Sequence, residues 1–256
     1  MSRAWIVLLL WLATASAGAV QVRASGAVSH AGVLPLHDAA RLSDAALAAQ
    51  PLPQAYLLGA AWLRAGLVVA QQRLKAGALF DLGQLQQRSR AHGRQALATT
   101  AAAMATWIGQ MPVTGRRPAS LLDPRAVEID PSANLLLADG DQLYYPLRPA
   151  TIRVVGAVAH ACTLPLVPLQ DARRYLAACT SSGAADRDSI YVIEPDGRVF
   201  VQGIALWNRS TPLALAPGAM IYVPLRKAAA STVDPTLNHD IAAFLATQLL
   251  PGPGVD

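Results

Sequence analysis

The sequence predicts an α+β protein made of two copies of one small sheet-and-helix unit, and a repeated phrase is the first observation behind this prediction. Residues 26–36 read GAVSHAGVLPL, and residues 156–166 read GAVAHACTLPL. When 22–36 is aligned with 152–166, nine of fifteen positions are identical at an offset of 130. Both phrases alternate apolar and polar residues around a small-residue turn, as a β-hairpin does. A repeat of this length indicates a duplicated folding unit.

The ends of the two units are the second observation. The first unit ends LADGDQLYYP at 137–146, and the second ends LAPGAMIYVP at 215–224. In each, a glycine turn leads into an apolar strand that a proline closes. The offset here is 78, so the first unit contains 52 extra residues.

The extra residues have the pattern of a helical hairpin. Apolar residues recur at helical spacing in two stripes, with a break at about 89–93. The stripes are Leu74, Ala78, Leu82 and Leu85, and Leu97, Ala101, Met104 and Ile108. We therefore expect a helical-hairpin insertion at about 53–110 in the first unit.

The second unit shows the order of elements without interruption. A hairpin is followed by a helical phrase at 169–178, a strand at 189–193, a Pro-Asp-Gly turn, a strand at 198–202 and the closing strand. This is the order of a β-grasp (ubiquitin-like) fold, in which a small mixed sheet curls around one helix. We expect two β-grasp domains, at 20–148 and 149–226.

A C-terminal amphipathic helix is predicted at 234–250. Asp234 is a good N-cap and Pro235 suits the first helical position. Its apolar stripe comprises Leu237, Ile241, Phe244, Leu245 and Leu249. Either the chain's own second unit or a docking partner must cover this stripe.

The N-terminus has the pattern of a cleavable signal peptide at 1–19. Arg3 precedes an apolar run at 4–13, and Ala15-Ser16-Ala17 has the form of a cleavage site. The run is too short to span a bilayer, so we expect a periplasmic protein that is not an integral membrane protein. In that oxidising compartment Cys162 and Cys179 either form a disulfide or are two small buried side chains, and both readings are open.

Little in the composition indicates a catalytic function. The net charge is +5, without a dense basic run interleaved with aromatic residues, so we expect no nucleic-acid partner. The five histidines lack metal-ligand spacing, and no glycine loop could hold a phosphate, so neither metal nor cofactor is predicted. A nucleophilic pair of His160 and Cys162 would be abolished by a disulfide. The prediction is a non-enzymatic protein, and the alternative is a polysaccharide lyase or hydrolase.

Several motifs carry a resemblance to known proteins. The second unit resembles the soluble-ligand-binding β-grasp (SLBB) domain of bacterial polysaccharide export proteins, through Val155–Val158, Asp196-Gly197 and 215–224. The chain as a whole is similar to the GfcC-like capsule biosynthesis family. The motifs are Thr114-Gly115-Arg116, Leu122-Asp123-Pro124, Arg148-Pro149 and Ala205-Leu206-Trp207-Asn208.

The resemblance implies a periplasmic protein that serves assembly or export of a capsular or exopolysaccharide. It also implies a ligand pocket near the arginine of the TGR motif, Arg116; because a second arginine follows, Arg117 is also a candidate. The other reading is that one of these arginines braces the interface between insertion and sheet. The terminal helix resembles the amphipathic helix of outer-membrane polysaccharide export channels, which makes such a channel a candidate partner.

Overall fold

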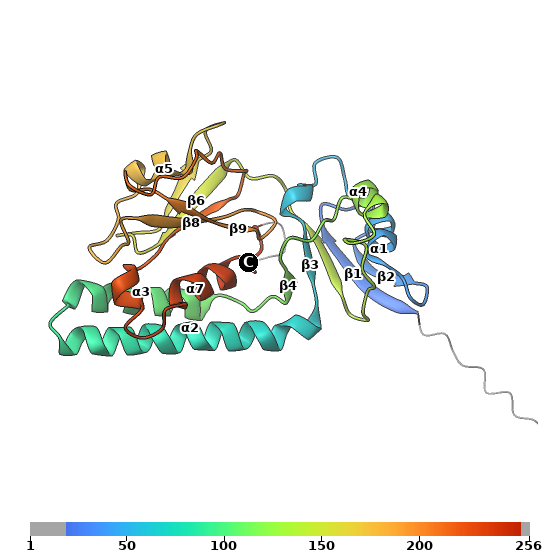
Figure 1. The fold of residues 1–256 in the computed structure, drawn as a ribbon. Helices are drawn as coiled ribbons and strands as arrows, with labels where there is room; N and C mark the ends of the chain where they lie inside the picture. Colours follow the sequence, from blue (N-terminus) through green and yellow to red (C-terminus); the bar gives the residue numbers. More distant parts are fainter. Residues whose placement is uncertain (1–18, 252–256) are drawn as a thin grey trace, which may run out of the picture.

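The computed structural model describes residues 19–251 (Figure 1). The predicted signal peptide lies outside the described residues except for Ala19, and it stays a prediction. None of the described helices combines the length and the apolar character needed to cross a membrane.

The first domain is built on a five-stranded mixed sheet in the order β2-β1-β5-β3-β4. Its strands are β1 (Val20–Gly26), β2 (Gly32–Leu36), β3 (Ala61–Leu63), β4 (Arg116–Arg117) and β5 (Gln142–Tyr145). β1 and β5 are parallel, and the other neighbours are antiparallel. Helices α1 (Leu42–Ala49) and α4 (Pro124–Ile129) accompany this sheet, and a 3-10 turn, η1 (Leu57–Gly59), precedes β3.

The second domain repeats this architecture, with the sheet order β7-β6-β10-β8-β9. Its strands are β6 (Thr151–Gly156), β7 (Cys162–Pro165), β8 (Ser189–Ile193), β9 (Val199–Gly203) and β10 (Met220–Val223). α5 (Ala172–Tyr175) and the 3-10 turn η2 (Leu176–Ala178) replace the longer helix of the first domain. β10 is parallel to β6 and antiparallel to β8. The two sheets confirm the predicted α+β class with two β-grasp domains.

Equivalent backbone contacts recur in both domains. The isolated β-bridges of Val28 with Pro51 and Ala55 with Leu147 have counterparts in Val158 with Ser181 and Ala185 with Leu225. Gly26 and Gly156 end the first strand of each domain with φ of 84° and 97°. A Cβ at these glycines would lie 2.1 Å from Tyr145 O and 2.4 Å from Val223 O, respectively. The repeated glycine is therefore required twice by the same close approach of the first strand to the last strand, its parallel neighbour.

The helical hairpin consists of α2 (Ala65–Ala91) and α3 (Gln95–Gln110), between β3 and β4. The expected insertion at about 53–110 begins too early, because Ala61–Leu63 pairs with β5 inside the sheet. A three-residue strand has no readable alternation of its own, so its pairing partner decides its conformation.

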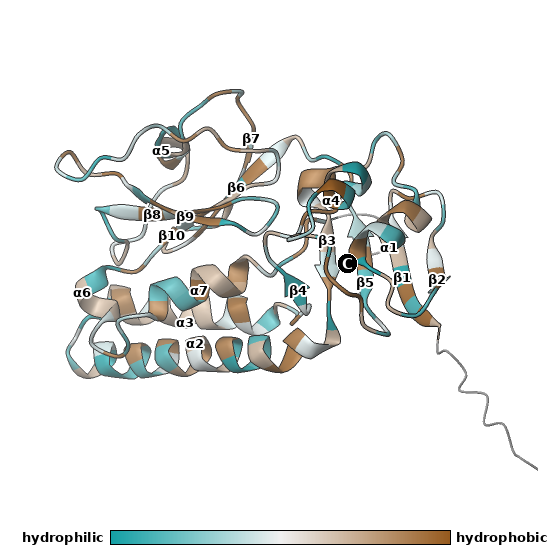
Figure 2. Cartoon of the chain, turned by 45° about the vertical axis from the view of Figure 1, so that its right-hand side comes forward, coloured by the Kyte–Doolittle hydropathy of each residue, from teal (hydrophilic) through white to brown (hydrophobic). Residues whose placement is uncertain are grey.

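The hairpin packs on the second domain rather than on the first domain, into whose sequence it is inserted. Buried residues of α2 and α3 share one core with β6, β8 and β10 and with α7 (Leu237–Leu245). In Figures 1 and 2, α2, α3 and α7 lie on the face of the second sheet opposite α5. All four residues of β10 are buried because both faces of the sheet are covered. The first domain keeps a separate core around Trp62 and Tyr145.

The C-terminal helix is shorter than predicted, and its apolar side chains are buried against the rest of the chain. Leu237, Ile241 and Phe244 have no exposed surface, and Leu245 is 1% exposed. The N-cap is Thr236 rather than Asp234. The Asp234 carboxylate instead accepts a hydrogen bond from the Thr236 N–H at 2.6 Å, which stabilises the turn before the helix. The helix ends at Leu245, not at 250.

Candidate functional site

The backbone around Arg116 is fixed by a glutamine on the inserted helix α2. Gln71 is 7% exposed; its Oε1 accepts from Gly115 N at 2.8 Å and its Nε2 donates to Arg116 O at 2.7 Å. Gly115 has a φ of 72°, and a Cβ there would lie 2.6 Å from Arg64 O. Only glycine fits this close approach. The TGR motif therefore leads into strand β4, and Gln71 on α2 holds its backbone in place.

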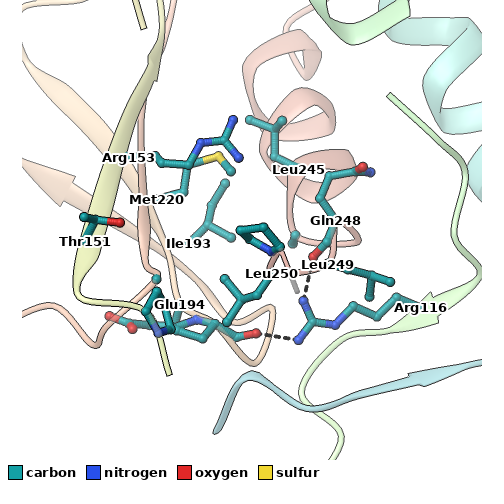
Figure 3. A pocket seen from close by; sticks show the side chains of 15 residues that line it. Arg116, Thr151, Arg153, Ile193, Glu194, Met220, Leu245, Gln248, Leu249 and Leu250 are labelled. Carbon is teal, nitrogen blue, oxygen red and sulfur yellow. Dashed lines mark hydrogen bonds between the residues drawn. The ribbon is translucent and has the colours of Figure 1, made fainter. Parts of the chain in front are cut away.

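The Arg116 side chain is buried at the junction of the two domains and the C-terminal segment (Figure 3). It is 3% exposed. Nη1 donates to Gln248 O at 2.8 Å, and Nη2 donates to Pro195 O at 2.5 Å and Ala60 O at 3.5 Å. Burial lowers the pKa of Arg116 to about 10. The guanidinium thus joins three segments that are far apart in the sequence.

Further hydrogen bonds close the same junction. Ala119 N donates to Asp196 O at 2.7 Å, which links the segment after β4 to the β8–β9 turn. The hydroxyl of Thr114 donates to Thr247 O at 2.7 Å, and that of Tyr144 donates to Leu250 O at 3.3 Å. These contacts favour a bracing role for Arg116, although the brace joins two domains and not insertion and sheet alone.

A small cavity lies beside the arginine. Its volume is about 60 Å³, and its polar lining includes Arg116, Arg153, Glu194 and Gln248. Such a volume holds a few water molecules and is far below the roughly 300 Å³ at which pockets for small molecules begin. Direct contact of Arg116 with a sugar therefore stays a prediction, and it requires the junction to open.

Buried charge characterises this cavity. Glu194 is 8% exposed, and burial raises its pKa above the usual 4.5. Its Oε2 accepts from Ala216 N at 3.3 Å. Burial lowers the pKa of Arg153 in the same way. Sequence reasoning missed these residues; the only signal for Glu194 is a charged residue between an apolar strand and a Pro-Asp-Gly turn.

The second candidate, Arg117, is separated from the cavity. Successive residues of a strand point to opposite sides, so Arg117 is exposed while Arg116 is buried. Its guanidinium carbon lies 5.7 Å from the centre of the Trp62 ring. The structure therefore does not bring the two arginines together in one site.

The cysteines and the first of the repeated histidines make structural contacts. Cys162 on β7 and Cys179 after η2 form a disulfide, so neither is a free nucleophile. His30 is exposed, and its Nδ1 lies 2.9 Å from Ala48 O. Within residues 19–251, no group of His, Cys, Asp and Glu side chains is arranged to hold a metal ion.

Comparison with known proteins covers most of the chain. Residues 16–148 match the family described as "Capsule biosynthesis GfcC, N-terminal", and residues 160–250 match "Capsule biosynthesis GfcC C-terminal". The "Uncharacterized protein YjbG" of Escherichia coli (strain K12) is 31% identical over 189 residues, which cover 73% of this chain and 76% of that protein.

Proposed function

Because this chain belongs to the GfcC capsule biosynthesis family, we propose that it is a non-catalytic periplasmic accessory protein. It serves the assembly or export of a capsular or exopolysaccharide and binds the glycan or an outer-membrane export channel. The observation that carries the non-catalytic assignment is that Nη1 and Nη2 of Arg116 and Oε2 of Glu194 are engaged with backbone groups at the domain junction.

Catalysis needs a side chain that can reach a substrate and exchange a proton with it. At the junction Arg116 donates to backbone carbonyls, and Glu194 accepts from a backbone N–H. Asp196 accepts from Arg198 N at 2.9 Å, and its other oxygen pairs with Arg198 Nε at 2.5 Å. The Arg116 bonds support a role in holding two domains in a fixed relation, whereas those of Glu194 and Asp196 lie within the second domain.

A channel partner would bind the folded chain with α7 in place. Four of its apolar side chains are buried in the core. Exposing each would cost about 1.5–3 kcal/mol, so release of the helix would consume most of the stability of an ordinary domain. This argues for recognition through surfaces that are already exposed.

Two measurements test the proposal. Deleting the gene should lower extracellular polymer, and expression of the intact chain should restore it. Purified protein incubated with the same polymer should yield neither new reducing ends nor unsaturated uronate absorbance. New ends would establish a hydrolase or lyase instead, and unchanged polymer in the deletion strain would remove the accessory role.

A further inference from the structure

A rigid turn after β9 holds two large apolar side chains in solvent. Leu206 is 87% exposed and Trp207 is 77% exposed. The turn is fixed by its own hydrogen bonds: Asn208 Oδ1 accepts from Ala205 N at 3.1 Å, and Asn208 Nδ2 donates to Asp188 O at 2.9 Å. A Cβ on Gly203 would lie 2.0 Å from Asn208 O, so only glycine permits this fold of the turn. The indole is therefore presented at a defined place.

Next to this turn lies a basic groove at the end of the second domain that is remote from the first domain. One hollow of about 760 Å³ runs from Asp188, the residue that anchors Asn208, to α6 (Lys227–Ala230). A second hollow of about 760 Å³ shares Arg226 and Ala228 with it and reaches the start of α3. Figure 2 shows α6 at the end of the molecule opposite α1 and β2.

Positive charge prevails in this groove. Its charged lining residues are Arg94, Arg187, Arg226 and Lys227 against Asp186 and Asp188. Asp186 is engaged with the backbone: one oxygen accepts from Asp188 N at 2.8 Å, and the other accepts from Lys227 N at 3.0 Å. That carboxylate shapes the groove, while the exposed Arg187 and Lys227 side chains are turned to solvent.

We propose that the Trp207 turn and the adjoining groove of Arg187, Arg226, Lys227 and Arg94 form a binding site for an acidic polysaccharide chain. The inference rests on the proposed function, whose polymer class it specifies. The face of an indole is negative, so the weakly positive C–H groups of a pyranose ring can stack on Trp207. Guanidinium groups pair with carboxylates through a planar fork of donors.

The charge pattern of the site favours a polymer strand over a lipid surface. The four cations line two adjoining hollows together with two carboxylates, whereas an anionic membrane surface attracts clusters of Lys and Arg. An anionic strand laid along the groove would place its charges at Arg187 and Arg226, and one sugar ring on Trp207.

The test uses the full mature chain and three anionic polymers: polygalacturonate, a pyruvylated glucan and a sulfated glucan. Neutral dextran and phosphatidylglycerol vesicles are the comparison ligands. The variants are Trp207→Ala, Trp207→Phe, Arg187→Glu and Lys227→Glu. Two residues exposed on α2 provide matched controls, Phe80→Ala and Arg73→Glu.

We expect at least one anionic polymer to bind, more weakly as salt rises, with little binding of dextran. Trp207→Ala and each charge reversal should weaken binding about tenfold or more, Trp207→Phe should retain most of it, and the α2 controls should match wild type. Binding to none of the polymers, equal binding by the variants, or binding to vesicles alone would overturn the site.

The same variants separate this site from the general function. If deleting the gene lowers extracellular polymer but the Trp207→Ala and Arg187→Glu variants restore it fully, polysaccharide binding in the groove is refuted and the accessory role stands. If deletion has no effect, the accessory role fails whatever the groove binds in vitro.

Discussion

Replacing Arg116 by alanine tests whether the domain junction depends on this side chain. The substitution removes two short hydrogen bonds, to Gln248 O at 2.8 Å and Pro195 O at 2.5 Å, and one at the limit of contact, to Ala60 O at 3.5 Å. Hydrogen bonds to a charged group contribute about 1.5–3 kcal/mol each. The two short bonds together therefore contribute about 3–6 kcal/mol.

An opposing effect reduces this loss. Burial lowers the pKa of Arg116 to about 10, and the cost of burying its charge is on the order of 3 kcal/mol. Alanine removes that cost but leaves a cavity and two buried carbonyls without donors. The first two effects leave a loss of about 0–3 kcal/mol, and the cavity and the two unpaired carbonyls add to it, so we expect the free energy of unfolding to fall by at least about 2 kcal/mol.

Urea unfolding of the mature chain measures this change as a lower midpoint at an unchanged slope. Arg116→Lys keeps the charge but lacks the planar fork, so it should lose about half as much. Arg117→Ala, at the exposed neighbouring position, should change stability by less than about 1 kcal/mol. A loss below about 1 kcal/mol for Arg116→Ala, combined with loss of polymer export, would refute the brace and restore the ligand role.

Three further predictions concern the second domain. Burial raises the pKa of Glu194, so the folded state keeps the proton to higher pH, and the free energy of unfolding falls as pH rises from about 4.5 through the raised pKa. Glu194→Gln should flatten this dependence of the unfolding free energy on pH, measured from pH 4 to 7. An identical dependence in the variant would contradict the prediction. Phe244→Ala should destabilise by about 3–5 kcal/mol because the ring is fully buried, and removing residues 234–256 should abolish folding by circular dichroism; a stable truncated chain would show that α7 is dispensable. Replacing Cys162 and Cys179 by serine should lower the unfolding free energy by about 3 kcal/mol, since their separation is 17 residues; a reductant should do the same to wild type and have no effect on the variant.

Much of the fold could be predicted because it follows from local patterns. The GAV-x-HA-x-x-LPL phrase marks the first hairpin of each domain, and its glycine is needed where the end of the first strand approaches the backbone of the last strand. Helical spacing of apolar residues located α2, α3 and α7, since one stripe of each must be buried. The stripe of α7 also indicated that something covers it, although the sequence left open what does.

Only the tertiary structure decided what those elements contact. β3 belongs to the sheet through its pairing with β5, more than seventy residues later in the chain. Arg116 finds its carbonyl partners 79 and 132 residues away, at Pro195 and Gln248, so no local pattern could separate a brace from a ligand contact. A side chain's chemistry is encoded at its own position, but its burial and its partners depend on how distant segments pack.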